Sequence, residues 1–139
     1  AKIIMKKRII IILSVFIAIL LLCIVTYKKQ TVYDKYAKIE IKDQNHNFGD
    51  ISINDTVNYS FQIKNVSETP FMISKVLPGC TCTAAGFTKG IIKTGKIAII
   101  NAKFIPKSTQ LGAIKNTILV QCNAEKGVVV LELSGFIKK

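Results

Sequence analysis

Two cysteines, Cys80 and Cys82, lie one residue apart in the segment LPGCTCTAAG, which covers residues 77–86. Thiols at this spacing can form a local disulfide or redox pair, bind a soft ion such as Cu(I), or pack as small apolar side chains. On a regular strand the Cα atoms of residues i and i+2 lie about 6.6 Å apart, at the limit that disulfide geometry tolerates. Pro78 and Gly79 provide a bend directly before the pair. The sequence therefore leaves three interpretations open: packing, a disulfide, or a metal site.

The remaining reactive side chains are expected to lie away from this pair. Cys122 ends a strand that should run antiparallel beside the strand before Cys80, which places the two thiols at opposite poles of a sandwich, about 30 Å apart. His46 is the only histidine, and we interpret it as a residue that packs against or caps a strand edge. The eight carboxylates are scattered, and no glycine-rich phosphate loop precedes a helix. We therefore expect no catalytic residues and predict that the protein is not an enzyme.

The amino-terminal part of the chain has the composition of a membrane anchor. Residues 9–25 are an uncharged, apolar run that would extend about 26 Å as a helix, close to the thickness of the hydrocarbon layer of a bilayer. Basic residues precede the run, and Tyr27 and two lysines follow it. We therefore predict a basic cytoplasmic tail over residues 1–8, a transmembrane helix over 9–26 and a juxtamembrane stalk over 27–37. The residues that represent this anchor are Ile9, Ile12, Phe16, Leu20, Val25 and Tyr27.

Two alternatives for this apolar run fit the neighbouring residues less well. A cleaved signal peptide would need a small-x-small site at the end of the run, which the sequence lacks. A lipoprotein would be acylated at Cys23, but Leu22 stands where a small residue is usual. Basic residues are more numerous before the run than directly after it. We therefore expect the amino terminus in the cytoplasm and the carboxyl-terminal domain in the periplasm, on a bacterial inner membrane.

The charge of the chain argues against a nucleic-acid partner. The formal net charge is +12, and residues 1–29 contribute six basic residues and no acidic one, so the remainder carries +6. Arg8 is the only arginine, whereas nucleic-acid-binding surfaces depend on arginine for bidentate contacts to bases and phosphates. A lysine-rich surface above anionic lipid headgroups explains the charge equally well. The expected partners are the bilayer, through the helix, and a membrane-embedded or envelope protein subunit.

After the stalk, the apolar pattern has the period of two that β-strands show. The clearest strand is TVNYSFQIKN, in which Val57, Tyr59, Phe61 and Ile63 alternate with polar residues and should face the core. Turn-forming residues recur roughly every eight to twelve positions. We expect about seven strands in about 100 residues, with TAAGFTKGIIKTGK after the cysteines as an irregular loop. The predicted fold class is all-β, an Ig-like sandwich over residues 38–139 that follows one transmembrane α-helix.

Several segments of this strand-rich part occur in an order that resembles a known family. The segments are HNFGDI, NVSETPFMISKV, CTCT, KTGKIAIINAKFIP, LGAIKNTILVQCN and LELSGFI. Together they resemble, over residues 38–138, a bacterial Ig-like family of unknown function that is similar to hydin-type (ASH) and major-sperm-protein-like domains. The resemblance implies an Ig-like fold with binding or scaffolding roles and no settled activity. Thr81 stands where this family has Gly, Asn47 where Asp is usual and Cys122 where Ser is usual.

These observations predict a single-pass membrane protein whose extracytoplasmic Ig-like domain is a non-catalytic interaction or accessory subunit of a membrane or envelope complex. Loops on a rigid sandwich usually carry recognition, so PGCTCTAAGF and IPKSTQLG are the candidate contact loops. Their candidate partner-binding residues are Pro78, Gly79, Thr81, Thr83, Phe87, Pro106 and Leu111. The alternative function is a thiol-based copper-binding or redox accessory factor that uses Cys80 and Cys82, with Cu(I) as the one cofactor to consider.

Overall fold

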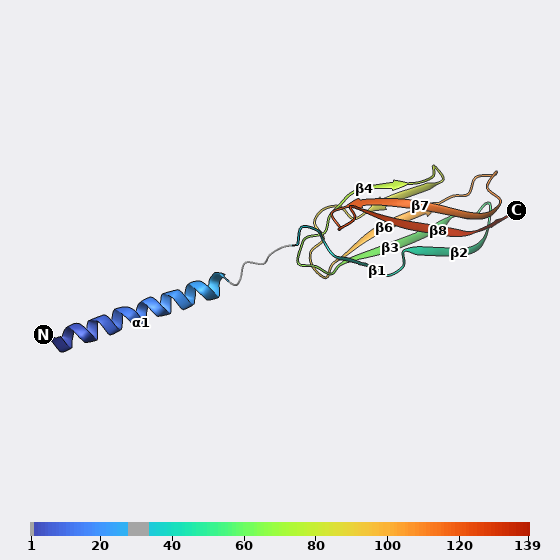
Figure 1. The fold of residues 1–139 in the computed structure, drawn as a ribbon. Coiled ribbons are helices and arrows are strands. Elements are labelled where there is room, and N and C mark those ends of the chain that lie inside the picture. Colours follow the sequence, from blue (N-terminus) through green and yellow to red (C-terminus); the bar gives the residue numbers. More distant parts are fainter. Residues whose placement is uncertain (1, 28–33) are drawn as a thin grey trace. The chain divides into compact units, whose positions relative to one another are not determined.

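The structure is a computed structural model that describes the backbone of residues 2–27 and 34–139 and the side chains of residues 3–24 and 34–139. The chain divides into two compact units, residues 1–33 and residues 34–139. The described part of the first unit is one α-helix, and the second unit holds eight β-strands (Figure 1). The boundaries expected for the tail, the membrane span and the stalk stay a prediction.

Helix α1 runs without a break from Lys2 to Tyr27 (Figure 1). It contains no Gly or Pro, and Leu, Ile, Ala and Lys residues sustain the helix along its length. The 22 residues Ile3–Ile24 are long and apolar enough to cross a membrane, by length and composition. Ser14 is the polar residue inside the uncharged run, and its hydroxyl donates to the Ile11 carbonyl at 2.9 Å, so this group has an acceptor within the helix.

The anchor residues predicted from the sequence lie along α1. Four of their side chains are more than half exposed: Ile9, Ile12, Phe16 and Leu20. A helix that is apolar on all sides has no face suited to water, which is the property expected of a membrane-spanning segment. The side chains of Val25 and Tyr27 lie outside the described residues. The interfacial position of Tyr27 therefore stays a prediction.

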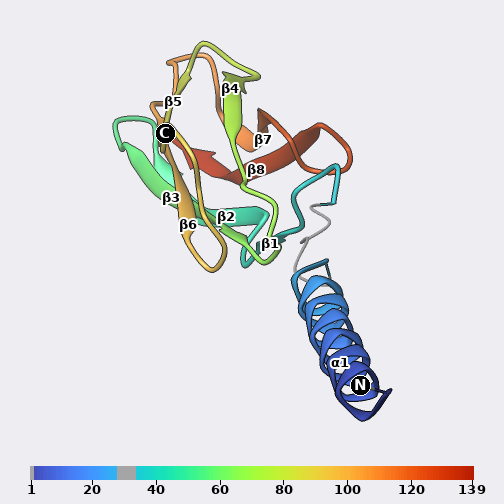
Figure 2. The same cartoon turned by 90° about the vertical axis from the view of Figure 1, so that its left-hand side faces the viewer.

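Two four-stranded sheets form the second unit and pack face to face as a sandwich (Figures 1 and 2). One sheet has the order β1-β3-β6-β5, with strands at Ile39–Ile41, Val57–Asn65, Ile97–Phe104 and Thr83–Phe87. The other has the order β2-β8-β7-β4, with strands at Asn45–Ser52, Val128–Lys138, Gly112–Cys122 and Ile73–Pro78. Neighbouring strands are antiparallel except for β2 and β8, which are parallel. The predicted all-β, Ig-like class is confirmed.

The core lies between the sheets and is filled by alternate residues of their strands. In β3 the alternation is as predicted, because Val57, Phe61 and Ile63 are buried while Tyr59 is half-buried. Phe61 is 1 % exposed and pairs with the fully buried Ile100 of β6. Full burial of a ring of this size stabilises the fold by about 2–3 kcal/mol.

Strand β5 corrects the prediction that the chain after the cysteines is an irregular loop. Residues Thr83–Phe87 pair in unbroken antiparallel register with β6. The sequence TAAGF conceals this strand because its two outward positions, Ala84 and Gly86, carry no polar side chain to mark an alternation. The sandwich therefore has eight strands instead of about seven, and β5 forms an outer edge of its sheet.

Two of the segments that carry the family resemblance, HNFGDI and LELSGFI, meet where β2 lies parallel to β8. The Phe48 ring covers Gly135 so closely that a Cβ at position 135 would overlap it. Phe48 also stacks near Phe104 of the other sheet, with ring centroids 5.8 Å apart. The glycine of one segment therefore makes room for the aromatic residue of the other.

At one pole of the sandwich, a buried polar cluster around Asn65 holds the turn after β3. The Asn65 side chain is 0 % exposed. Its amide nitrogen donates to the carbonyl oxygens of Thr69 and Ile92, each at 2.9 Å. Its amide oxygen accepts from the backbone N–H and the hydroxyl of Ser67, at 3.0 and 2.9 Å. The amide is thus fully engaged inside the fold, and we name this end, residues 65–69 with Ile92, the Asn65 pole.

Candidate functional site

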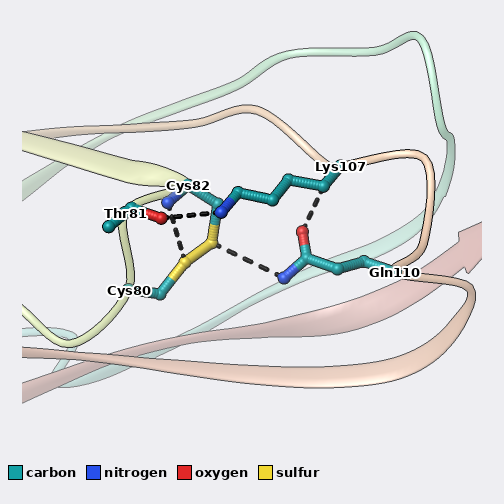
Figure 3. Close-up of a disulfide and its surroundings, with 5 residues drawn as sticks. All are labelled: Cys80, Thr81, Cys82, Lys107 and Gln110. Atoms are coloured by element: carbon teal, nitrogen blue, oxygen red, sulfur yellow. Dashed lines mark hydrogen bonds between the residues drawn. A yellow bond between two sulfur atoms is a disulfide. The ribbon is translucent and has the colours of Figure 1, made fainter.

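The opposite pole contains the cysteine pair, in the turn that connects β4 to β5 (Figure 3). Cys80 and Cys82 form a disulfide, and their Cα atoms lie 5.3 Å apart. This is closer than on a regular strand because the chain turns here, with the Thr83 N–H donating to the Cys80 carbonyl at 3.2 Å. Cys82 is also packed in the core and is 7 % exposed. Of the three interpretations left open by the sequence, the structure therefore combines two, the local disulfide and packing against the core.

The described residues offer no metal centre beside this disulfide, since none of them form a group of three or more His, Cys, Asp or Glu side chains suited to an ion. Cu(I) prefers thiolates, so a copper site here would require the pair to be reduced. Cys122 lies opposite Ile73 at the start of β4, whereas Pro78 ends β4 beside the cysteines. Cys122 and the pair therefore lie at opposite ends of β4, as predicted, but the six residues of this strand extend about 20 Å, which is less than the predicted separation. Burial raises the pKa of the Cys122 thiol.

A second loop, residues 105–111 between β6 and β7, is hydrogen-bonded to the cysteine turn (Figure 3). Lys107 Nζ donates to Thr81 Oγ1 at 2.7 Å, and Gln110 Nε2 donates to Cys82 Sγ at 3.6 Å. The loop is also closed on itself, because the Lys107 N–H donates to Gln110 Oε1 at 2.9 Å and the Gln110 N–H to the Lys107 carbonyl at 2.8 Å. The two candidate contact loops thus lie side by side. We name this surface, residues 79–82 and 105–111, the cysteine pole.

The seven candidate contact residues differ in accessibility. Gly79, Thr81 and Leu111 are exposed, Pro78 and Phe87 are half-buried, and Thr83 and Pro106 are buried. Gly79 has a packing role, because a Cβ there would lie 2.8 Å from Thr117 Oγ1. Phe87 ends β5 and lies away from the cysteine turn. Thr81 and Leu111 therefore present the accessible side chains of this set at the cysteine pole, and partner binding by them stays a prediction.

A hollow of about 490 Å³ opens beside the cysteine turn, next to β5 and β6. It is lined by Thr81, Cys82, Ala84, Lys103, Ile105, Pro106 and Lys107. Lys103 and Lys107 are both exposed, and neither forms an ion pair within residues 34–139. Two uncompensated ammonium groups make the hollow suitable for an anionic group.

Charge is distributed unevenly over the sandwich. Residues 69–124, which include β4 to β7, contain seven lysines and no acidic residue, and all eight carboxylates lie in residues 34–68 and 125–132. One of these lysines, Lys115, is paired with Glu132 at 2.7 Å, and the other six have no ion pair among the described residues. The strands from β4 to β7 therefore form a positive part of the molecule. The signal was visible in the sequence as a long stretch without a carboxylate, but the net charge of the whole chain concealed it.

A separate polar cluster joins Asp43, His46 and Tyr59. His46 stacks on Tyr59 with ring centroids 3.5 Å apart and planes within 9°. The Tyr59 hydroxyl donates to Asp43 Oδ2 at 2.6 Å, and His46 Nδ1 lies 3.4 Å from the same oxygen. The bond from Tyr59 lowers the pKa of the Asp43 carboxyl, and the same bond raises the pKa of Tyr59. The interpretation of His46 as a packing residue is confirmed. The partners could have been sought from the sequence, because a tyrosine at a core-facing position needs a polar group for its hydroxyl.

The sandwich matches a known protein family. A family model described as a protein of unknown function (DUF1573) covers residues 39–137 of this chain. The match confirms the resemblance to an Ig-like family of unknown function that the ordered segments indicate. No curated protein matches the chain.

Solved structures resemble the sandwich at low sequence identity. A protein of unknown function from Porphyromonas gingivalis W83 has a TM-score of 0.66 and 16% identity, covering 78% of this chain and 51% of that chain. The ASH or PapD-like domain 7 of human CEP192 has a TM-score of 0.57 and 16% identity, covering 80% and 92%. The VesB protease of Vibrio cholerae has a TM-score of 0.56 and 12% identity, covering 75% and 32%. This chain thus spans about half of the first protein and about a third of the protease, and these likenesses show the fold alone.

Proposed function

We propose that this chain, which belongs to the DUF1573 family of proteins of unknown function, is a membrane-tethered Ig-like module that docks on a partner protein through its cysteine pole. The module is non-catalytic and acts as an accessory subunit of a membrane or envelope complex. The observation that carries the proposal is the joining of two separate loops, residues 79–82 and 105–111, into one surface. Loops fixed on a rigid sandwich are common sites of recognition.

Order at the cysteine pole supports binding there. The disulfide fixes the turn covalently, and the Ile105 N–H donates to the Cys82 carbonyl at 3.0 Å, which extends the pairing of β5 with β6 into the second loop. A surface that is ordered before docking loses less conformational entropy when a partner binds. Thr81 offers a polar contact on this surface, and Leu111, which is 53% exposed, offers an apolar one.

The tether in this proposal is α1, and the sandwich lies in the periplasm of a bacterium. Lys6, Lys7 and Arg8 near the start of α1 favour an amino terminus in the cytoplasm. The disulfide supports the same orientation, because disulfides persist in the periplasm while cytoplasmic thiols are kept reduced.

A second candidate function uses the disulfide itself as a redox centre or, once reduced, as a Cu(I) site. The observation that favours it is the half-buried position of Cys80, which leaves part of this residue accessible at the surface. Anaerobic titration of the reduced full-length chain with Cu(I) tests it, with the double variant Cys80→Ser/Cys82→Ser as the control. Stoichiometric uptake by the native chain alone supports this function, and equal uptake by both chains excludes it.

Photo-cross-linking of the full-length chain in its native membrane tests the docking proposal. A photoreactive amino acid replaces Thr81 or Leu111 at the cysteine pole, and a matched control replaces Lys126, an exposed residue of the β7–β8 turn. We expect both pole positions to give the same single adduct and the Lys126 position to give none. Identical adducts from all three positions, or no adduct from the pole, would contradict the proposal.

A further inference from the structure

We infer that β5 is a docking edge, to which an extended and acidic segment of the partner adds as a further strand of the β1-β3-β6-β5 sheet. The inference rests on the proposed function and specifies how the partner is held and what its chemistry is. In this mode of recognition, main-chain hydrogen bonds hold the added strand and side-chain contacts select its sequence.

Three of the four edge strands carry features that discourage pairing with another chain. β1 has three residues and is flanked by Lys38 and Lys42. β2 has an irregular register between Asn47 and Asp50. β4 has an irregular register near its start and ends at Pro78, which has no N–H. Short length, charge, bulges and proline are the usual means of blocking edge-to-edge pairing.

β5 has none of these features. Its five residues, TAAGF, include no charged residue and no proline. Its register with β6 is unbroken from Thr83 to Phe87, and it is the last strand in the order of its sheet. A regular edge left open in this way is a template for another strand.

The pattern of hydrogen bonds shows which groups of β5 face away from β6. Directly after β5, the Thr88 N–H donates to the Ile99 carbonyl at 2.9 Å. Bonded and non-bonded pairs alternate along an antiparallel ladder, so Gly86 and Ala84 also bond to β6. The residues between them therefore direct their backbone groups to the opposite side.

Ala85 and Phe87 are these outward-directed residues. Within residues 34–139, their N–H and C=O groups make no hydrogen bond to a strand, loop or side chain. Two donors and two acceptors therefore stand in a row along the open edge, in the arrangement that one added strand would satisfy.

The solvent face beside this edge gives an added strand room. Ala84 and Gly86 are exposed, and their side chains are the smallest available. A Cβ built on Gly86 would meet no atom within 4 Å. An incoming strand could therefore approach the backbone of β5 without displacing a side chain.

The chemistry of the occupant follows from the charge around the edge. Lys103 pairs opposite Ala84 on the neighbouring strand, Lys89 follows β5, and no carboxylate lies on β4, β5, β6 or β7. The hollow lined by Ala84, Lys103 and Lys107 lies at the start of the edge. Lys107 now donates to the neutral Thr81 hydroxyl, and a carboxylate would be a stronger acceptor for its ammonium group. An acidic segment is therefore the partner that this edge favours.

The test uses the full-length chain in lipid nanodiscs and two short synthetic peptides. One peptide alternates Glu with Val and Thr, and the other carries Lys in place of each Glu. We expect the acidic peptide to slow amide hydrogen exchange at Ala85 and Phe87 by about tenfold, and the basic peptide to leave it unchanged. N-methylation of the acidic peptide at the residues that face β5 should abolish this effect, whereas methylation at the alternate residues should not.

Protein variants provide a second measurement of the same binding. Ala85→Pro removes an outward N–H that the fold does not use, and Lys103→Glu with Lys107→Glu reverses the charge of the hollow. Both changes should weaken binding of the acidic peptide by about tenfold or more, while Lys126→Glu, which lies outside this surface, should not. Unchanged thermal unfolding of each variant establishes that the fold is intact.

Several outcomes overturn the inference: no slowed exchange at millimolar acidic peptide, slowed exchange at β1 or β2 instead, or equal binding of the basic peptide. Concentration-dependent protection of Ala85 and Phe87 without peptide would show that a second copy occupies the edge, which also overturns it. Persistence of the cross-links from Thr81 and Leu111 in the Ala85→Pro chain would leave the proposed function standing and remove the inference about β5. If the chain without the Ala85→Pro change also gives no cross-link from Thr81 or Leu111, the proposed function itself is contradicted.

Discussion

The two poles of the sandwich are stabilised in different ways. At the Asn65 pole, a fully buried amide directs all of its hydrogen bonds to groups inside the fold. At the cysteine pole, a disulfide and hydrogen bonds from Lys107 and Gln110 hold two loops together at the surface. The Asn65 amide is buried and fully hydrogen-bonded inside the fold, so it cannot contact a partner, whereas the polar groups of Thr81 and Lys107 lie at the surface. The comparison therefore favours the cysteine pole as the recognition surface and the Asn65 pole as a structural one.

The two poles also differ in how completely their buried hydroxyl groups are hydrogen-bonded. Thr83, at the start of β5, is buried, and its hydroxyl has no hydrogen-bond partner among the described residues. The Ser67 hydroxyl at the Asn65 pole, in contrast, bonds to Asn65 Oδ1 at 2.9 Å and to the Thr69 carbonyl at 3.1 Å. A pole whose polar groups are incompletely paired contributes less to stability per buried atom. Changes at the two poles should therefore have unequal effects on folding.

The largest expected effect is at the Asn65 pole. Asn65→Ala removes four hydrogen bonds inside the fold, two to the Thr69 and Ile92 carbonyls and two from Ser67, and it leaves the Ser67 N–H without an acceptor. We expect the free energy of unfolding to fall by about 3–5 kcal/mol in urea denaturation. The matched control Asn58→Ala, at an exposed position of the same strand, should change it by less than about 0.5 kcal/mol. A loss below about 1 kcal/mol for Asn65→Ala would contradict the structural role of this pole.

A smaller effect is expected from removing the disulfide. Cys80→Ser/Cys82→Ser opens a very short loop and places a hydroxyl at the buried position 82, so we expect a loss of about 2 kcal/mol. Mass spectrometry checks the chemistry: reduction should add the mass of two hydrogen atoms to the native chain and to a Cys122→Ser chain, and nothing to the double variant. A bridge from Cys122 to either cysteine would contradict the assigned strand order.

The cluster of Asp43, His46 and Tyr59 predicts a pH dependence that belongs to neither pole. The pKa of Asp43 is lowered in the fold, so its contribution to stability is present above the usual carboxylate pKa and is lost as the pH falls through the folded value. The pKa of Tyr59 is raised, so its contribution is present below the usual phenol pKa and is lost as the pH rises. Tyr59→Phe should reduce the change in unfolding temperature with pH in both the acidic range, where Asp43 titrates, and the alkaline range, where Tyr59 titrates. If the pH dependence of the unfolding temperature is the same in the variant, the hydrogen bond between Tyr59 and Asp43 is not its cause.

The smallest expected effect on folding is at the exposed face of the cysteine pole. Thr81→Ala removes one surface hydrogen bond, from Lys107, and Leu111→Ala removes an exposed side chain. Each should change the free energy of unfolding by less than about 0.5 kcal/mol. The amount of the chain that co-purifies with its partner should nevertheless fall, because these side chains form the proposed contact. Undiminished co-purification of both variants would place the contact elsewhere.

The elements that the sequence predicts well have strong and regular patterns. The uncharged run of residues 9–25 indicated a long apolar helix, and the structure contains α1 from Lys2 to Tyr27. The alternation of β3 indicated its buried face, because Phe61 and Ile63 recur with the period of the strand. Where burial follows a regular period, the sequence alone therefore predicts which residues face the core.

The features that the sequence did not predict depend on contacts between distant segments. β5 becomes a strand because β6 pairs with it, since its own residues show no alternation. The cysteine pole forms because Lys107 reaches Thr81 and Gln110 reaches Cys82, and neither contact has a local sequence signal. The sequence indicated both loops of the candidate site. Only the structure shows that these loops lie side by side and that an open strand edge lies next to them.

Amide hydrogen exchange of the chain alone and in its isolated partner complex tests whether the cysteine pole is the docking surface. We expect complex formation to protect residues 79–87 and 105–111 and to leave exchange at residues 65–69 of the Asn65 pole unchanged. Protection of the Asn65 pole with no change at the cysteine pole would contradict this expectation.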